Sequence, residues 1–117
     1  MIEVLPTSQA NRLGLRFSGK LTAKEREQVY VPQVEHILES YGSIRLLLQF
    51  DEHFAGAEPG AFDGAFLGRR IDRFEKVAVI GEPERFFPIK LASRNMKGEF
   101  RVFESDQAQE AWRWLEQ

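Results

Sequence analysis

The sequence contains no cysteine, and this excludes several kinds of site. A chain without thiols forms no disulfide, offers no thiolate to a metal ion and has no cysteine nucleophile. The opening residues, Met1 to Pro6, lack the basic stretch and apolar core of a signal peptide, so a cytoplasmic location is expected. No apolar run approaches the roughly 20 residues of a membrane-spanning helix, so the chain is not expected to be transmembrane.

An excess of one charge is also lacking. The chain of 117 residues has a net charge of -2, so nucleic acid is not an expected partner. Its hydrophobic fraction of 43% and charged fraction of 29% are typical of a globular protein. At this length one domain over residues 1–117 is the simplest expectation, and it buries roughly two-thirds of the unfolded surface. The abundant residue is phenylalanine, which occurs ten times.

The stretch Ile44 to Phe50 is the predicted centre of the fold. It is a nearly unbroken apolar run, and Leu47 shares a face with Arg45 and Gln49. A strand that is apolar on both faces is best covered on both faces, which indicates a central strand between helices. The residues after such a strand lie at its carboxyl end, where sites gather in open α/β sheets.

The first part of the chain predicts a hairpin and a broken helix. Ile2–Leu5 and the alternating Arg12–Ser18 are expected to pair as antiparallel strands. Thr22 and Glu25 have the spacing of a capping box at a helix start. Pro32 predicts a break near Tyr30-Val31, because proline removes a backbone donor and crowds the preceding turn. The inner face of this helix is predicted to hold Tyr30, Val34, Ile37, Leu38 and Tyr41, and Gly42 is its predicted cap.

The rest of the chain alternates between strands and helices. We expect helices over about 61–73 and 84–93, and strands at 77–80 and 100–103. Ser105 or Asp106 is the predicted cap of a last helix, and Trp114 is expected to point away from the inner face formed by Ala108, Ala111, Trp112 and Leu115. The predicted fold class is α/β: a mixed, mostly parallel sheet of about five strands with about four helices, in the order β-β-α-β-α-β-α-β-α.

Several of these pieces together carry a family resemblance. They are Gly19-Lys20-Leu21-Thr22, Val31-Pro32, Arg45-Leu46-Leu47-Leu48, Val77-Ala78-Val79-Ile80-Gly81 and Ala111-Trp112-Arg113-Trp114-Leu115. With them the chain resembles, over nearly its whole length, the SpoIIAA-like family of small bacterial proteins. That family is related to STAS domains and shares its fold with the CRAL-TRIO (Sec14-type) lipid-binding domains. The resemblance implies a single STAS-like domain. Its motifs are those of a fold and not of a catalytic site.

The sequence departs from one branch of these relatives. STAS domains that antagonise anti-sigma factors are switched by phosphorylation of a serine just after the central strand. The corresponding stretch here, Asp51 to Asp63, contains no serine or threonine. A regulatory role of that kind would therefore have to work without the phosphate acceptor.

One polar cluster follows the predicted central strand, and two interpretations of it stay open. Asp51, Glu52, His53, Glu58 and Asp63 supply carboxylates and one imidazole. They could form a metal site, or an acid/base site in which Asp51 or Glu52 orients His53. They could equally form a solvated loop whose acidic residues cap the following helix. The spacing matches no established metal-ligand motif, and no metal is predicted.

Two sets of residues near the same edge suggest binding surfaces. Gly60, Gly64 and Gly68 lie on one helix face, where they could admit a partner backbone, weaken a movable lid or simply face water. Together with Trp114 they are the candidate interface of a homodimer or a protein partner. The second set consists of six phenylalanines that would line an apolar pocket or fill an aromatic core: Phe50, Phe54, Phe62, Phe66, Phe86 and Phe87.

The function hypotheses follow in order of preference. The first is a non-enzymatic STAS-like binding domain that holds a small apolar or lipid-like ligand. The second is a protein–protein interaction or regulatory module, monomeric or homodimeric. The last is a hydrolase or metal-dependent enzyme that uses Asp51 and His53. We expect no cofactor and no catalytic residue, because the sequence has no phosphate-binding loop, dinucleotide fingerprint or activated nucleophile.

Overall fold

The computed structural model describes residues 1–6, 8–58, 71–81 and 98–117. The predicted helix over 84–93 lies outside these residues. Of the predicted helix over 61–73 only the short 3-10 turn η2 (Ile71–Arg73) is described. The described residues form two helical units, where about four helices were predicted. One is the run of α1 (Ala23–Glu25), η1 (Arg26–Tyr30) and α2 (Val31–Tyr41), and the other is α5 (Ala108–Glu116). The full alternation of strands and helices remains a prediction.

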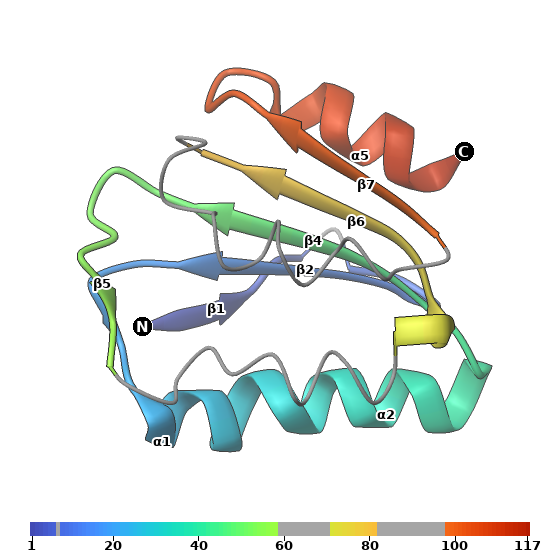
Figure 1. Ribbon diagram of the computed structural model, residues 1–117, viewed down its shortest axis with the longest axis horizontal. Helices are drawn as coiled ribbons and strands as arrows, with labels where there is room; N and C mark the ends of the chain where they lie inside the picture. Colours follow the sequence, from blue (N-terminus) through green and yellow to red (C-terminus); the bar gives the residue numbers. More distant parts are fainter. Residues whose placement is uncertain (7, 59–70, 82–97) are drawn as a thin grey trace.

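Five strands form the main sheet, and the predicted mixed, mostly parallel arrangement is confirmed. The strands are β1 (Ile2–Val4), β2 (Arg12–Phe17), β4 (Ile44–Phe50), β6 (Phe74–Ile80) and β7 (Glu99–Phe103). Their order is β1-β2-β4-β6-β7, so β4 is central as predicted (Figure 1). β1 runs antiparallel to β2, which confirms the hairpin, and every other neighbouring pair is parallel.

Helices cover both faces of the sheet, as the double-sided apolar pattern of β4 predicted. The run of α1 (Ala23–Glu25), η1 (Arg26–Tyr30) and α2 (Val31–Tyr41) lies on one face, and α5 (Ala108–Glu116) lies on the other (Figure 1). Ile44, Leu46 and Leu48 belong to the core cluster under α2, whereas Leu47 belongs to the cluster under α5. Because β4 buries apolar side chains on both faces, its central position in the sheet is favourable. None of the helices in the described ranges is long and apolar enough to span a membrane.

The long helix is interrupted where Pro32 predicted. Immediately before it, η1 is a π-helical turn in which the Val31 amide donates to the carbonyl of Arg26, five residues back. A proline ring crowds the carbonyl four residues earlier and offers no N–H, so a wider turn relieves the clash. Gly42 ends α2 in the left-handed conformation with φ 81°, which confirms the predicted cap. The prediction for Tyr41 is wrong, because its side chain in the last turn is 56% exposed.

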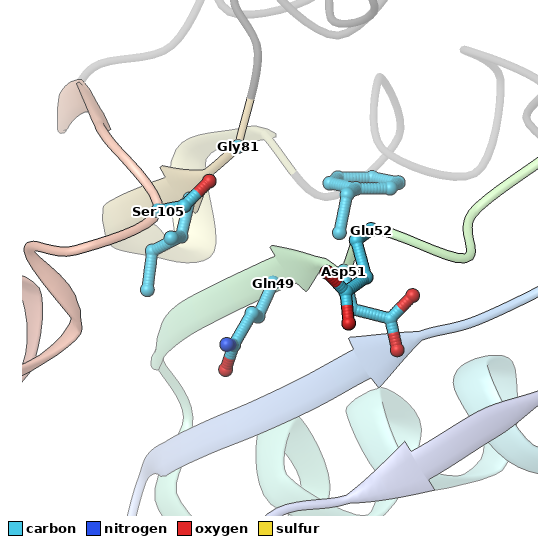
Figure 2. A pocket seen from close by; sticks show the side chains of 7 residues that line it. Gln49, Asp51, Glu52, Gly81 and Ser105 are labelled. Carbon is cyan, nitrogen blue, oxygen red and sulfur yellow. The ribbon is translucent and has the colours of Figure 1, made fainter.

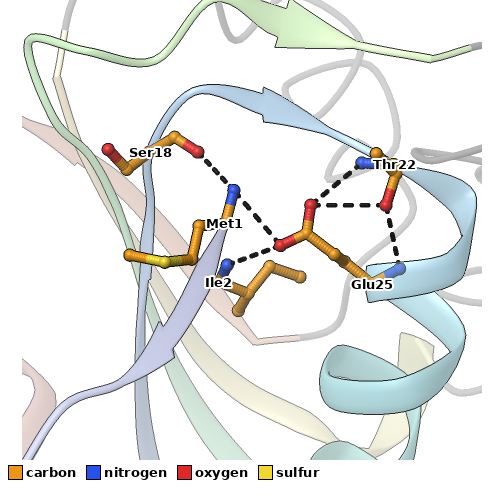
Figure 3. Close-up of polar contacts among 5 residues, drawn as sticks. All are labelled: Met1, Ile2, Ser18, Thr22 and Glu25. Carbon is orange, nitrogen blue, oxygen red and sulfur yellow. Dashed lines mark hydrogen bonds and ion pairs between the residues drawn. The ribbon is translucent and has the colours of Figure 1, made fainter.

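The start of α1 is tied to the first strand through Glu25. The predicted capping box is present: the Glu25 amide donates to Thr22 Oγ1 over 3.1 Å and the Thr22 amide donates to Glu25 Oε1 over 3.4 Å. The same carboxylate accepts the Ile2 amide at 3.0 Å and lies 3.2 Å from the Met1 amino group, which also donates to the Ser18 carbonyl (Figure 3). One carboxylate therefore joins the N-terminus, β1 and α1.

α5 is docked by its aromatic side chains and by two basic residues. Trp112 covers Gly14 of β2, where an added Cβ would lie 2.6 Å from the indole. Trp114 packs against Phe103 with ring centroids 5.9 Å apart, and Lys76 Nζ lies 5.1 Å from its ring. The expectation that Trp114 points away from the sheet is therefore wrong. Arg45 donates to the Leu115 carbonyl and Lys76 donates to the Trp114 carbonyl. Both carbonyls lie at the C-terminal end of α5, where the helix dipole makes a nearby cation favourable.

Two further details differ from the sequence predictions. β6 begins at Phe74 and not at Val77. Phe74 is buried and pairs with Ile44 of β4, so the pairing extends the strand towards its amino end. The cap of α5 is Gln107 and not Ser105 or Asp106. Those two residues form a turn that closes with a 2.9 Å bond from the Gln107 amide to the Glu104 carbonyl, so the helix starts after them.

Candidate functional site

A cavity of about 370 Å³ lies at the carboxyl ends of β4 and β6. The sequence predicted a site at this edge, because sites in open α/β sheets gather at the carboxyl ends of the strands. Figure 2 shows Asp51 and Glu52 at the tip of β4 and Gly81 and Ser105 across from them. The described residues that line the cavity are Gln49, Phe50, Asp51, Glu52, Ile80, Gly81 and Ser105.

Asp51 is the most constrained polar group of this lining. Its Oδ2 accepts from Arg16 Nε over 3.1 Å and its Oδ1 accepts from the His53 amide over 2.9 Å, and the side chain is only 9% exposed. Burial by itself raises the pKa of this carboxyl. The hydrogen bonds from Arg16 and from the His53 backbone, with the charge of Arg16, outweigh burial and hold the pKa below its usual value. Asp51 is therefore ionised, and its charge is offset by Arg16.

Two other members of the sequence cluster, Glu52 and His53, lie at the surface. His53 Nε2 is 3.5 Å from Glu52 Oε1, and their side chains are 72% and 86% exposed. Asp51 receives the backbone N–H of His53 and not its ring, so it does not orient the imidazole as an acid/base pair requires. Within residues 1–6, 8–58, 71–81 and 98–117, no group of three or more histidines and carboxylates is placed to hold a metal ion.

Glu58 has a structural role that the sequence did not indicate. Its Oε2 accepts from the Ala23 amide over 3.1 Å, so it helps to cap the start of α1. Two backbone hydrogen bonds join the segment after β4 to the residues before α1. The Ala55 amide donates to the Gly19 carbonyl and the Glu58 amide donates to the Leu21 carbonyl, each over 2.8 Å. These bonds flank a small parallel sheet of β3 (Lys20–Leu21) and β5 (Gly56–Ala57), which was not predicted.

Phe50 and Phe54 lie in the core cluster beneath α2. The Phe50 ring stacks on Phe17 at 4.9 Å between centroids and meets the Phe54 ring edge-on at 4.7 Å. Phe50 also lines the cavity. Several predicted site residues fall outside the described residues, where their roles remain predictions: Gly60, Phe62, Asp63, Gly64, Phe66, Gly68, Phe86 and Phe87.

Sequence reasoning missed four of the lining residues: Gln49, Ile80, Gly81 and Ser105. The sequence did contain a signal for two of these residues: Gly81 directly follows the predicted strand 77–80, and Ser105 follows the predicted strand 100–103. Neighbouring parallel strands end at the same edge of a sheet, so the residues after them converge. Recognising that convergence required the strand order, in which β6 lies between β4 and β7.

Comparisons with known proteins find a family and a structural relative. A family model described as SpoIIAA-like matches residues 12–116. The chain is similar to a crystal structure of an uncharacterized protein from the DUF3478 family with a SpoIIAA-like fold, from Shewanella loihica PV-4. The two are 26% identical with a TM-score of 0.70, and the match covers 98% of this chain and 92% of the other. No curated protein matches the chain.

Proposed function

The chain belongs to the SpoIIAA-like family, and on that premise we propose that it is a non-enzymatic binding domain for a small amphipathic ligand. The observation that carries this proposal is the cavity at the carboxyl edge of the sheet. Its volume of about 370 Å³ falls in the range of small-molecule sites, which run from roughly 300 to 1,000 Å³.

The chemistry of the lining supports a ligand with both apolar and polar parts. Phe50 and Ile80 are the apolar side chains of the described lining, and Gln49, Glu52 and Ser105 offer hydrogen-bonding groups. A ligand that covers both kinds of group gains hydrophobic contact without leaving a buried polar atom unpaired. This mixed lining favours an amphiphile over a purely hydrocarbon ligand.

The state of the acidic residues supports binding and not catalysis. A general base works best with a pKa near the working pH, whereas the hydrogen bonds from Arg16 and from the His53 amide hold the pKa of Asp51 below its usual value. His53 is exposed and its ring lies beside Glu52, outside the lining of the cavity. These contacts give the cluster a structural explanation that needs no reaction.

Native mass spectrometry on protein purified without detergent tests the proposal. We expect a reproducible extra mass on the folded protein that is released on denaturation and corresponds to a small amphiphile. Ser105 is exposed and lines the cavity, so Ser105→Trp should fill the mouth and lower ligand occupancy at least about tenfold without unfolding the chain.

The matched control is Asp106→Trp, which adds the same indole to the next, exposed position outside the cavity lining. It should leave occupancy unchanged. A bare protein mass, together with no uptake of added single-chain amphiphiles, would refute the proposed function. Equal loss of ligand in both variants would move the binding site away from this cavity.

A further inference from the structure

We propose that this cavity selects amphiphiles with a cationic head group, such as an alkylammonium, and discriminates against anionic ones. The inference rests on the proposed function, because it assigns a ligand class to the same cavity. It is carried by the charges around the cavity and by the ion pair that neutralises one of them.

The charged side chains among the described lining residues are two carboxylates, Asp51 and Glu52, with no basic side chain. Arg16 reaches one of them from the neighbouring strand β2, with Nε 3.1 Å from Asp51 Oδ2. The pair leaves little net charge at Asp51, since an arginine and an ionised carboxylate cancel at longer range.

Among the described lining residues, Glu52 is then the carboxylate without a basic partner, and it sets the sign of their net charge. Its side chain is 86% exposed, and among the described residues it lies 3.5 Å from His53 Nε2. A solvated carboxylate at the rim attracts an ammonium and repels a carboxylate or phosphate in the same position. Gln49 and Ser105, which also line the cavity, can accept hydrogen bonds from an ammonium through their side-chain oxygens.

The size of the discrimination follows from this exposure. A charge pair about 5 Å apart changes a binding constant only several-fold in a water-like medium and by much more where the pair is shielded from water, and an exposed pair lies near the lower limit. Attraction of a cation and repulsion of an anion act in opposite directions on the two ligands. We therefore expect roughly a tenfold difference in affinity between otherwise identical amphiphiles.

The test measures binding of dodecylamine, dodecanol and dodecanoate by titration calorimetry at low salt, below the micelle concentrations of the two ionic probes and the solubility limit of dodecanol. The three probes share one chain length and differ in head-group charge. The wild-type protein should bind dodecylamine roughly tenfold more tightly than dodecanoate, with dodecanol between them. The variant Glu52→Gln, which keeps the size of the side chain, should reduce that ratio to about two or less.

The control is Glu99→Gln, which removes the same charge from the exposed first residue of β7, at the amino end of that strand. It should keep the wild-type ratio. Equal or tighter binding of dodecanoate by the wild-type protein, or an unchanged ratio in Glu52→Gln, would overturn the head-group inference while leaving the binding function intact. Failure of all three probes to bind would overturn the binding function itself, and the inference with it.

Discussion

Replacing Gly14 with alanine tests how α5 is held on the sheet. A Cβ at Gly14 would lie 2.6 Å and 2.7 Å from ring carbons Cζ2 and Cη2 of Trp112, and 3.1 Å from Cδ1 of Leu5. Favourable carbon–carbon contacts are about 3.5–4.0 Å, so the indole would have to retreat by about 1 Å. Because Trp112 lies on α5 beside the buried Ala111 and Leu115, that retreat would disturb the whole contact of the helix with the sheet.

The expected cost can be estimated from two opposing effects. Alanine in a strand is more favourable than glycine by roughly 0.5–1 kcal/mol, since glycine loses more backbone freedom on folding. Overfilling a close-packed contact costs roughly 1–3 kcal/mol, because side chains are forced from their preferred positions. The clash at Gly14 is severe, so we expect Gly14→Ala to lower the free energy of unfolding by about 1–2 kcal/mol. At this chain length that corresponds to a melting temperature lower by roughly 4–8 °C.

A double-mutant cycle with Trp112→Leu separates the clash from other effects. Urea unfolding followed by circular dichroism gives the free energy of each variant. Trp112→Leu removes the ring that the new methyl would strike, so Gly14→Ala should cost little or even stabilise the protein in that background. The coupling energy should then be about 1–2 kcal/mol. Additive effects, or a Gly14→Ala variant as stable as the wild type, would refute the argument that Trp112 requires glycine at this position.

Two further predictions concern the ends of the described elements. Gly98→Ala should destabilise the protein by at least about 2 kcal/mol in the same urea assay, because its Cβ would lie 2.2 Å from the Glu75 carbonyl oxygen, a backbone atom that cannot yield easily. Glu25 is the other case. Burial raises its pKa, but the Met1 amino group and Thr22 lower it more, so the folded-state pKa lies below the ordinary 4.5. The stabilisation from Glu25 is therefore present above that pH and is lost as the pH falls through the folded-state pKa. Glu25→Gln should cost about 1 kcal/mol at pH 7 and lose less stability than wild type from pH 6 to pH 3, whereas the exposed control Glu27→Gln should follow wild type.

The parts of the fold that could be predicted are those set by near neighbours in the sequence. The capping box joins Thr22 to a residue three positions away, and the turn before Pro32 relieves a clash within the same helix. The central position of β4 could also be predicted, because its own side chains are apolar on both faces and need cover on both. Each of these features leaves its signal within a short window of sequence.

The errors arose where a distant segment decides the outcome. Helical spacing places Trp114 away from Ala111 and Leu115, but its indole reaches sideways to Phe103 and Lys76, which come from other strands. Glu58 accepts the Ala23 amide, 35 positions earlier in the chain, a contact that its place in the sequence did not indicate. Long polar and aromatic side chains span neighbouring elements, so their partners follow from the tertiary arrangement and not from periodicity.

The charge of the candidate site is the strongest case of this dependence. The sequence predicted carboxylates at the end of β4, and the structure places Asp51 and Glu52 there. Whether they act together depends on the strand beside them. β2 lies next to β4 with Arg16 opposite Gln49, which brings the guanidinium to Asp51. With a neutral residue in place of Arg16, the same loop would present two uncompensated carboxylates, the usual chemistry of a cation site. The order of the sheet thus leaves Glu52 as the carboxylate without a basic partner among the described lining residues.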